Sequence, residues 1–131
     1  MPGSYTQQIS RKFTAGENLA AYRVVVTGAG PVVNLADAGD TYPVGTTGID
    51  GAVAKGAAVD VTLWNAPGTR LVTAGGIITA GAAVALAAHG KIVAATSETE
   101  YYGVALEAAA GDGAVIEVLP IAGMAAAPSG S

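Results

Sequence analysis

The sequence predicts a mainly β protein: a compact β-sandwich or barrel-like domain of short strands, with an internal pseudo-repeat and an extended N-terminal arm. Three observations lead to this prediction. Hydrophobic residues make up 51% of the 131 residues but aromatic ones only 5%, so the core must be built from Val, Ile, Leu and Ala. Nineteen glycines punctuate the chain at a spacing that suits turns between short strands. One succession of strand-like and turn-like segments also occurs twice, about 60 residues apart.

The individual strands follow from alternation of apolar and polar residues. Val59, Val61 and Leu63 alternate with polar side chains, which places the three on one face of a strand. Residues 116–118 show the same alternation near the end of the chain. Further strands are expected at 23–26, 32–35, 77–78, 91–93 and 103–106, with Gly-rich and Asp-rich turns between them.

The internal repeat is defined by landmarks in a constant order. The first copy has a valine run at 24–26, then Gly-Pro-Val-Val at 30–33, Tyr-Pro-Val-Gly at 42–45 and a strand pattern at 55–61. The second has 84–86, Gly-Lys-Ile-Val at 90–93, Tyr-Tyr-Gly-Val at 101–104 and 112–118. One such unit cannot bury its own hydrophobic face. We therefore expect pseudo-repeats at about 15–65 and 74–121 within one β-rich domain, 15–121.

Two alanine-rich stretches, 80–89 and 106–110, also have high helix propensity, because Ala loses no side-chain entropy in a helix. For the first, the repeat favours a strand, since it aligns Val84 and Leu86 with the β-prone valines of the first copy. The second is too short for a helix that is stable without packing. The sequence leaves open whether either stretch is helical.

The ends of the chain differ from its body. Residues 1–14 are polar and are expected to form an arm, and residues 122–131 form a small-residue tail. An extended segment can add a strand to the exposed edge of another chain; the alternative is a disordered leader. The candidate contacts with a partner surface or another protomer are Tyr5, Gln7, Gln8, Ile9, Arg11, Lys12 and Phe13 in the arm, and Trp64.

Trp64 has two interpretations. It lies on the polar face of its strand, and tryptophan is enriched at interface hot spots, so it can be an anchor for a partner. It can equally cap the far side of a sandwich. Tyr101 and Tyr102 point to opposite faces of an extended segment, so one is expected in the core and the other at the surface.

The candidate chemical groups favour structural roles. Gly28-Ala29-Gly30 follows a strand like the start of a dinucleotide-binding turn, but Val33 stands where the third glycine would be, which favours a simple turn. Asn34, Asp37 and Asp40 could offer oxygens to Ca²⁺, although their spacing matches no known loop. Solvated turn residues are the preferred interpretation.

His89 is the single histidine, and a Ser-His-Asp site would need it as the base. The sequence has no Gly-x-Ser-x-Gly motif to supply the nucleophile. Glu98, Glu100 and Glu107 could form paired carboxylates, but one tryptophan and few bulky residues provide little material for a sugar-binding cleft. We therefore expect the protein not to be an enzyme and to need no cofactor or metal.

Charge and composition exclude other classes of partner. The net charge is −4 and the chain has no basic run, so nucleic-acid binding is not expected. The chain has no cysteine, which excludes disulfides and thiolate metal sites. Its longest apolar run, 82–88, is too short for a membrane span of about 20 residues.

The second half contains four short motifs in succession: Ile-Thr-Ala-Gly at 78–81, Gly-Lys-Ile-Val at 90–93, Gly-Val-Ala-Leu-Glu-Ala-Ala-Ala-Gly-Asp-Gly at 103–113 and Val-Ile-Glu-Val at 115–118. In these motifs it resembles the small capsid decoration (cement) proteins of tailed bacteriophages. The first half offers Gly-Ala-Val-Ala at 51–54 and Val-Asp-Val at 59–61. The resemblance covers roughly residues 15–120.

This resemblance implies a virion structural protein, made in the host cytoplasm, that decorates the outer surface of an icosahedral capsid. Its partners would be the major capsid protein and its own copies in a homotrimer, and no catalytic residue comes with the family. One alternative is a ligand- or carbohydrate-binding β-sandwich module of a virion appendage, using Trp64, Tyr101 and Tyr102. A small hydrolase using His89 or the carboxylates at 98 and 100 is the least favoured class.

Overall fold

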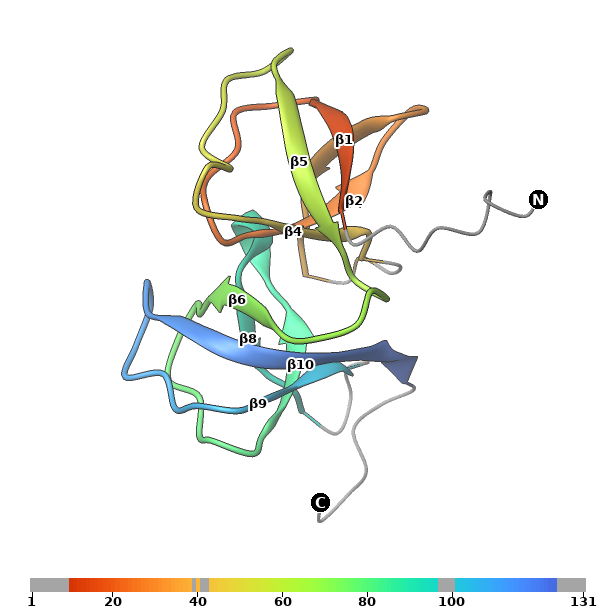
Figure 1. The fold of residues 1–131 in the computed structure, drawn as a ribbon. Helices are drawn as coiled ribbons and strands as arrows, with labels where there is room; N and C mark the ends of the chain where they lie inside the picture. Colours follow the sequence, from red (N-terminus) through yellow and green to blue (C-terminus); the bar gives the residue numbers. More distant parts are fainter. Residues whose placement is uncertain (1–9, 39, 41–42, 97–100, 125–131) are drawn as a thin grey trace, which may run out of the picture.

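In a computed structural model, the structure describes residues 10–38, 40, 43–96 and 101–124. It confirms the mainly β fold, with two five-stranded units placed one above the other (Figure 1). The first unit is a closed barrel in the order β1-β3-β2-β4-β5. Its strands are β1 (Ser10–Ala15), β2 (Val24–Thr27), β3 (Val32–Leu35), β4 (Gly45–Thr47) and β5 (Ala58–Leu63).

The second unit is a sheet in the order β6-β10-β9-β7-β8. Its strands are β6 (Arg70–Thr73), β7 (Ala83–Leu86), β8 (Ile92–Ala94), β9 (Tyr101–Ala105) and β10 (Val115–Met124). The short 3-10 helix η2 (Ala88–Gly90) joins β7 to β8. In Figure 1 this unit lies below the barrel, with β10 running across its front.

The two units have the same topology, strand for strand. In the barrel, β1 pairs in parallel with β3, and Ala15 lies opposite Val33. In the second unit, Ala74 lies opposite Ile92 in a single parallel bridge at the equivalent place, 59 positions further along. The β2–β3 pair Val25↔Leu35 likewise recurs as Val84↔Ala94. The second unit therefore repeats the topology of the barrel, but its first and third strands, β6 and β8, are connected only by this single bridge next to the end of β6.

Loop hydrogen bonds recur in the same way. Gly56 N–H donates to Ala15 O at 2.8 Å, and Gly113 N–H donates to Ala74 O at the same distance. The structure thus confirms the internal repeat but corrects its alignment in the early strands. The equivalent of Val84 is Val25 rather than Val24, because the offset there is 59 residues and not 60.

A glycine is required at one equivalent position in each unit. A Cβ on Gly45 would collide with the carbonyl oxygen of Thr62 on the neighbouring strand, and one on Gly103 would lie 2.9 Å from the carbonyl oxygen of Leu119. The two neighbours are themselves equivalent, since Thr46 pairs with Thr62 as Val104 pairs with Leu119. The close strand approach is thus a conserved feature of both copies of this unit.

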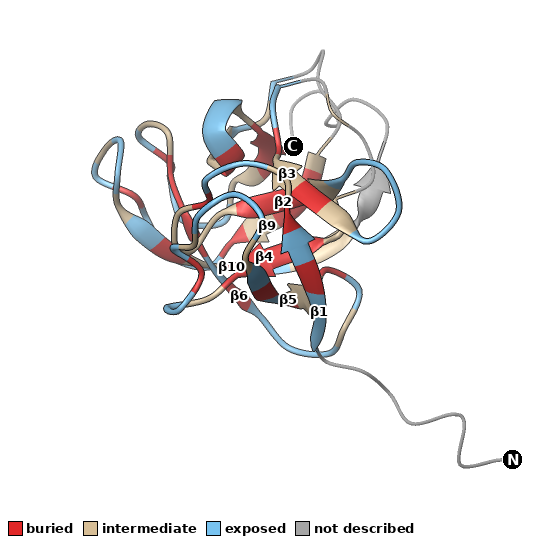
Figure 2. Ribbon diagram, turned by 90° about the horizontal axis from the view of Figure 1, so that it is seen from above, coloured by how far each residue is buried: buried red, intermediate tan, exposed pale blue. Residues whose placement is uncertain are grey.

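The strand alternation predicted for 59–63 is confirmed by burial. Val59 and Val61 face the interior, whereas Asp60 faces solvent. Figure 2 shows this alternation of buried and exposed residues along the strands. The barrel core consists of Phe13, Ala15, Leu19, Val25, Val33, Val59 and Val61.

The second core crosses the boundary between the units. It contains Val24 and Ala36 of the first unit together with residues of all the strands β6–β10, among them Val72, Val84, Ile92, Tyr102 and Val118. Gly90 N–H donates to Ala36 O at 2.7 Å, and Arg23 Nη1 donates to His89 O at 2.9 Å. The two units therefore share apolar packing and backbone hydrogen bonds.

The segment between β5 and β6 is organised by Arg70. Its guanidinium donates to four backbone carbonyl oxygens, of which Leu63 O and Ala66 O are bonded by Nη2 and Thr69 O and Pro67 O by Nη1. Burial of the side chain lowers the pKa of Arg70, although the group stays cationic. One cation thus bonds four carbonyls of the link between the two units.

The alanine-rich stretch 80–89 contains strand β7 and the start of the short 3-10 helix η2, and the stretch 106–110 is a loop. Residues 83–86 form β7, as the repeat favoured. The stretch 106–110 is not helical: Ala109 pairs with Ile78 in an antiparallel bridge. In both cases pairing with neighbouring strands outweighs the intrinsic preference of alanine.

The boundaries of the domain are wider than the sequence suggested. Residues 1–9 of the expected arm lie outside the described residues, but 10–14 belong to β1, which pairs with both β3 and β5. At the other end, β10 runs through Met124, and 125–131 lie outside the described residues. Phe13 explains the first difference, because its side chain is part of the barrel core.

Candidate interaction surfaces

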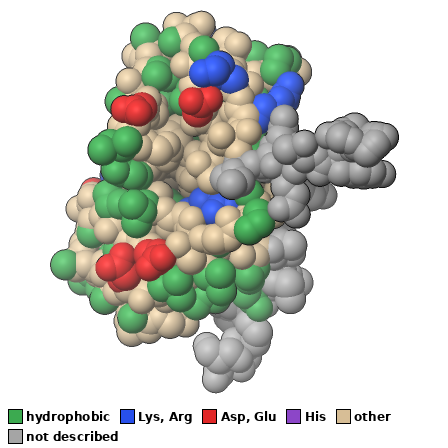
Figure 3. All heavy atoms as spheres, viewed as in Figure 1, with side chains coloured by type: hydrophobic (Ala, Val, Ile, Leu, Met, Phe, Trp, Pro, Cys, Tyr) green, Lys and Arg blue, Asp and Glu red, His purple; other side chains and the backbone are tan. Residues whose placement is uncertain are grey.

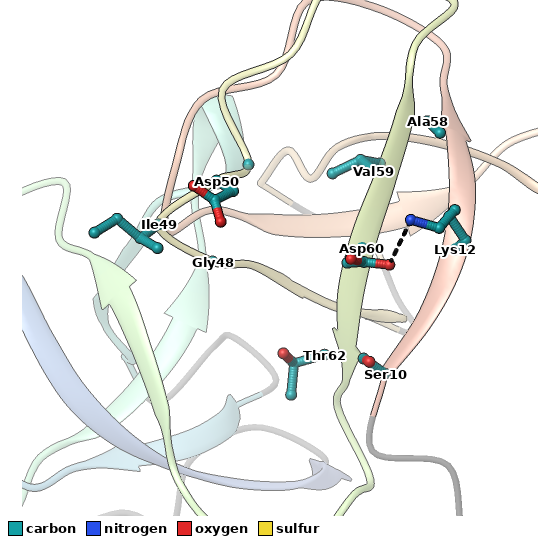
Figure 4. A pocket seen from close by; sticks show the side chains of 10 residues that line it. Ser10, Lys12, Gly48, Ile49, Asp50, Ala58, Val59, Asp60 and Thr62 are labelled. Carbon is teal, nitrogen blue, oxygen red and sulfur yellow. Dashed lines mark ion pairs between the residues drawn. The ribbon is translucent and has the colours of Figure 1, made fainter.

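A shallow groove lies on the outer side of the barrel, between β5 and the loop that follows β4. Its volume is about 380 Å³. Figure 4 shows Lys12 reaching from β1 towards Asp60 on β5, with Asp50 and Ile49 on the opposite loop. Lys12 Nζ lies 3.3 Å from Asp60 Oδ1, and both side chains are largely exposed. The groove thus has a mixed polar and apolar lining, and its lysine already lies beside a carboxylate.

The outer face of the second sheet has a different character. Leu71 of β6 and Val115 and Leu119 of β10 are 47%, 43% and 43% exposed, and Leu106, just after β9, is 45% exposed. We call these four residues, together with Glu117, the apolar face. Leu71 lies directly across from Glu117, which Val115 and Leu119 flank on the same strand. Figure 3 shows hydrophobic side chains gathered over this lower unit around a pair of acidic ones.

The acidic side chains at this surface are held by local hydrogen bonds. Glu117 Oε2 accepts from Thr69 Oγ1 at 2.6 Å. Glu107 Oε1 accepts from the backbone N–H of Glu117 at 2.7 Å. These bonds fix two carboxylates beside exposed leucines, an arrangement that suits a partner carrying both apolar and cationic groups.

The residues predicted as contacts are dispersed. Arg11 and Lys12 are exposed on β1, where the Arg11 guanidinium lies 5.0 Å from the centre of the Phe13 ring. Phe13 itself is buried in the barrel core, so it is not available to a partner. Tyr5, Gln7, Gln8 and Ile9 lie outside the described residues.

Trp64 was predicted as a contact with a partner, and the structure corrects this prediction. Its side chain is only 6% exposed, and its Nε1 donates to Tyr102 O at 3.2 Å and Ile121 O at 3.0 Å. The indole thus closes the core of the second unit and does not face a partner. Its place after the end of β5 explains the error, because the strand alternation does not extend to it.

The residues that the sequence offered as candidate catalytic or metal-binding groups take part in local structural contacts. His89 lies in η2 with a φ of 63°, and its carbonyl accepts from Arg23. Asp40 accepts from the backbone N–H of Asp37 in a turn. Among the residues that the structure describes, no three His, Cys, Asp or Glu side chains are grouped to hold a metal ion. Glu98 and Glu100 lie outside those residues.

Gly28-Ala29-Gly30 forms the turn between β2 and β3, as predicted. Of the two tyrosines, Tyr102 is buried in the core as expected for one of them, whereas Tyr101 is half-buried and not fully at the surface. Within the described part of the chain, no helix has the length and apolar character needed to cross a membrane.

Sequence reasoning missed the apolar face, although a signal for it was present. Aligning the last strands of the two copies sets Ala-Val-Asp-Val-Thr at 58–62 beside Val-Ile-Glu-Val-Leu at 115–119. The inward positions stay apolar in both, but two of the three outward positions become larger and more apolar in the second copy. Periodicity alone identifies only the buried face, so this difference appears only when the copies are compared.

Comparison with known proteins gives a likeness of fold. No protein-family model and no curated protein matches the chain. Among solved structures, it is similar to the N base of the head fiber protein gp8.5 of bacteriophage phi29. The TM-score is 0.63 and the sequence identity 22%, over 86% of this chain and 93% of that one. The chain therefore has the fold of a phage head fiber base.

Proposed function

We propose that this protein is a virion structural protein that decorates and stabilises the outer surface of an icosahedral phage capsid by binding the major capsid protein. The observation that carries the proposal is the fold shared with the head fiber base of phage phi29 over most of both chains. It agrees with the resemblance of the motifs at 78–81 and 103–113 to those of the cement proteins.

The distribution of side chains supports a role through surfaces rather than catalysis. Four of the six exposed large hydrophobic residues in the described part of the chain form the apolar face, whereas His89 and Asp40 have local structural partners. We therefore propose that the protein is not an enzyme and functions as a homotrimer at the virion surface. The carbohydrate-binding alternative has less support, because Trp64 and Tyr102 are buried and offer no stacking platform.

The proposal is tested with capsids from the phage that encodes the chain, prepared from a strain in which its gene is deleted. Purified protein added back to these capsids is expected to bind saturably and to raise the temperature at which the shells disrupt. Bound protein is quantified by sedimentation with the capsids, and shell disruption by calorimetry. Absence of binding at every ionic strength tested would overturn the proposal.

A further inference from the structure

The two units of this chain provide an internal comparison for their surfaces. Their strand registers match, so each outward residue of β6 and β10 has an equivalent on β1 and β5. Lys12↔Asp60 in the barrel corresponds to Leu71↔Glu117 in the second unit. Two further equivalences follow from the same registers: Ala58 with Val115, and Thr62 with Leu119.

This comparison shows that the fold does not need apolar residues at these positions. The barrel carries an ion pair and a threonine on the same face of the same strand pair, and its inward residues still form a core. In the second unit that ion pair is replaced by a leucine opposite a glutamate, and the threonine by another leucine. Exposed apolar clusters of this kind mark sites of interaction.

The negative charge of Glu117 on the apolar face argues against a second copy of the chain as the partner. Two copies meeting symmetrically through this face would bring Glu117 close to its own counterpart, and each copy has a net charge of −4. Of the chain's six cations, Lys12 and Lys91 are in ion pairs, and Arg23 and Arg70 donate to backbone carbonyls. The other two, Arg11 and Lys55, are exposed on the barrel and not on the apolar face. A second copy that presents its own apolar face therefore offers no Lys or Arg to pair with Glu117.

We propose that the apolar face, formed by Leu71, Leu106, Val115, Glu117 and Leu119, is the surface that binds the major capsid protein, at a patch combining apolar side chains with at least one Lys or Arg. This inference rests on the function proposed above and assigns it to one side of the molecule. The leucines supply buried area, and the carboxylates of Glu117 and Glu107 supply the register through charge-assisted hydrogen bonds.

The decisive variant places the barrel's own residues on the second unit: Leu71→Lys, Val115→Ala and Leu119→Thr together. Because the equivalent strand pair already carries these residues in the barrel, the fold is expected to be retained. The matched control changes the barrel instead, with Lys12→Ala and Thr62→Ala. Far-UV circular dichroism verifies folding of both variants before binding is measured.

The triple variant is expected to bind gene-deleted capsids at least about tenfold more weakly than wild type, because it loses the central apolar contacts. The barrel control is expected to bind like wild type. Glu117→Gln is expected to weaken binding and to reduce its dependence on salt, since one charge pair is lost.

Each other outcome overturns a distinct part of the proposal. If wild type fails to bind, the proposed function is wrong and this assignment falls with it. If wild type binds and the triple variant binds equally well, the function stands but the face is wrong. Analytical ultracentrifugation tests whether a second copy of the chain, and not the capsid protein, covers this face. An oligomer that is present in wild type and lost in the triple variant would show that it does.

Discussion

Two side chains, Trp64 and Lys91, make contacts that connect segments distant in sequence. Trp64 joins the end of β5 to the core of the second unit, and its N–H donates to the backbone carbonyls of Tyr102 and Ile121. Lys91, just before β8, reaches Asp112 in the turn before β10, with Nζ 2.8 Å from Oδ1.

The Lys91–Asp112 pair predicts a dependence of stability on pH. The hydrogen bond and the charge of Lys91 lower the pKa of Asp112 below its ordinary value of 3.8. A lowered carboxyl pKa means that the unfolded chain takes up the proton first. The stabilising contribution is therefore complete above the unfolded pKa and is lost as the pH falls through the folded pKa.

For Asp112→Asn we expect a slightly lower melting temperature at neutral pH, and a difference from wild type that disappears in acid below the ordinary pKa. The effect is small because Asp112 is exposed. Thermal unfolding from about pH 2 to pH 7 measures it. Asp50→Asn, which removes an exposed carboxylate elsewhere, is the control, and an equal pH dependence in both variants would contradict the assignment.

At the level of elements, the link between β5 and β6 depends on one residue. The Arg70 guanidinium adds to the backbone hydrogen bond from Ala66 N–H to Leu63 O by donating to the carbonyls of residues 63, 66, 67 and 69. Because these carbonyls are bonded to a charged donor, each bond contributes more than a neutral one. The connection is therefore a structured element rather than a flexible tether.

Arg70→Met keeps the aliphatic stem but removes the donors, and we expect it to lower the free energy of unfolding by about 3 kcal/mol. Chemical denaturation followed by circular dichroism measures the change. Arg23→Met is the matched control, since Arg23 donates to a single carbonyl at 2.9 Å, and its expected cost is about 1 kcal/mol. Equal costs for both substitutions would show that the carbonyl network does not stabilise the link.

At the level of the whole molecule, the two units behave as one folding unit. Val24 belongs to barrel strand β2, but its side chain is fully buried in the core of the second unit. Ala36 contributes from the loop after β3, and η2 reaches back to it through Gly90. Loss of either unit would expose apolar surface on the other.

This shared core predicts a single cooperative unfolding transition. Fluorescence of Trp64, which reports on the second unit, and far-UV circular dichroism, which reports on both, are expected to give coincident curves. Val24→Ala is expected to destabilise by about 2 kcal/mol through the cavity it leaves and to move both curves together. A variant whose two probes separate would mean that the units unfold independently.

Much of the fold could be predicted from the sequence because its determinants are local. Alternation at 59–63, the turn at 28–30 and the recurrence of landmarks depend on neighbouring residues, and the structure confirms them. The start of β1 could not be found in this way. Residues 10–14 look polar, and only pairing with β3 and β5 shows that Phe13 faces a core.

The mainly β and duplicated character of the protein can be recognised in the sequence alone, because strand periodicity and turn residues are encoded at short range. Three features depend instead on how the folded strands pair: the first copy closes into a barrel, Trp64 is buried and Leu71 is exposed. These depend on which strands pair across distances of about 45 residues or more, as in Ser10↔Thr62 and Glu117↔Leu71, and on what then covers each face. The apolar face is the result, since its residues become neighbours only when β6 pairs with β10.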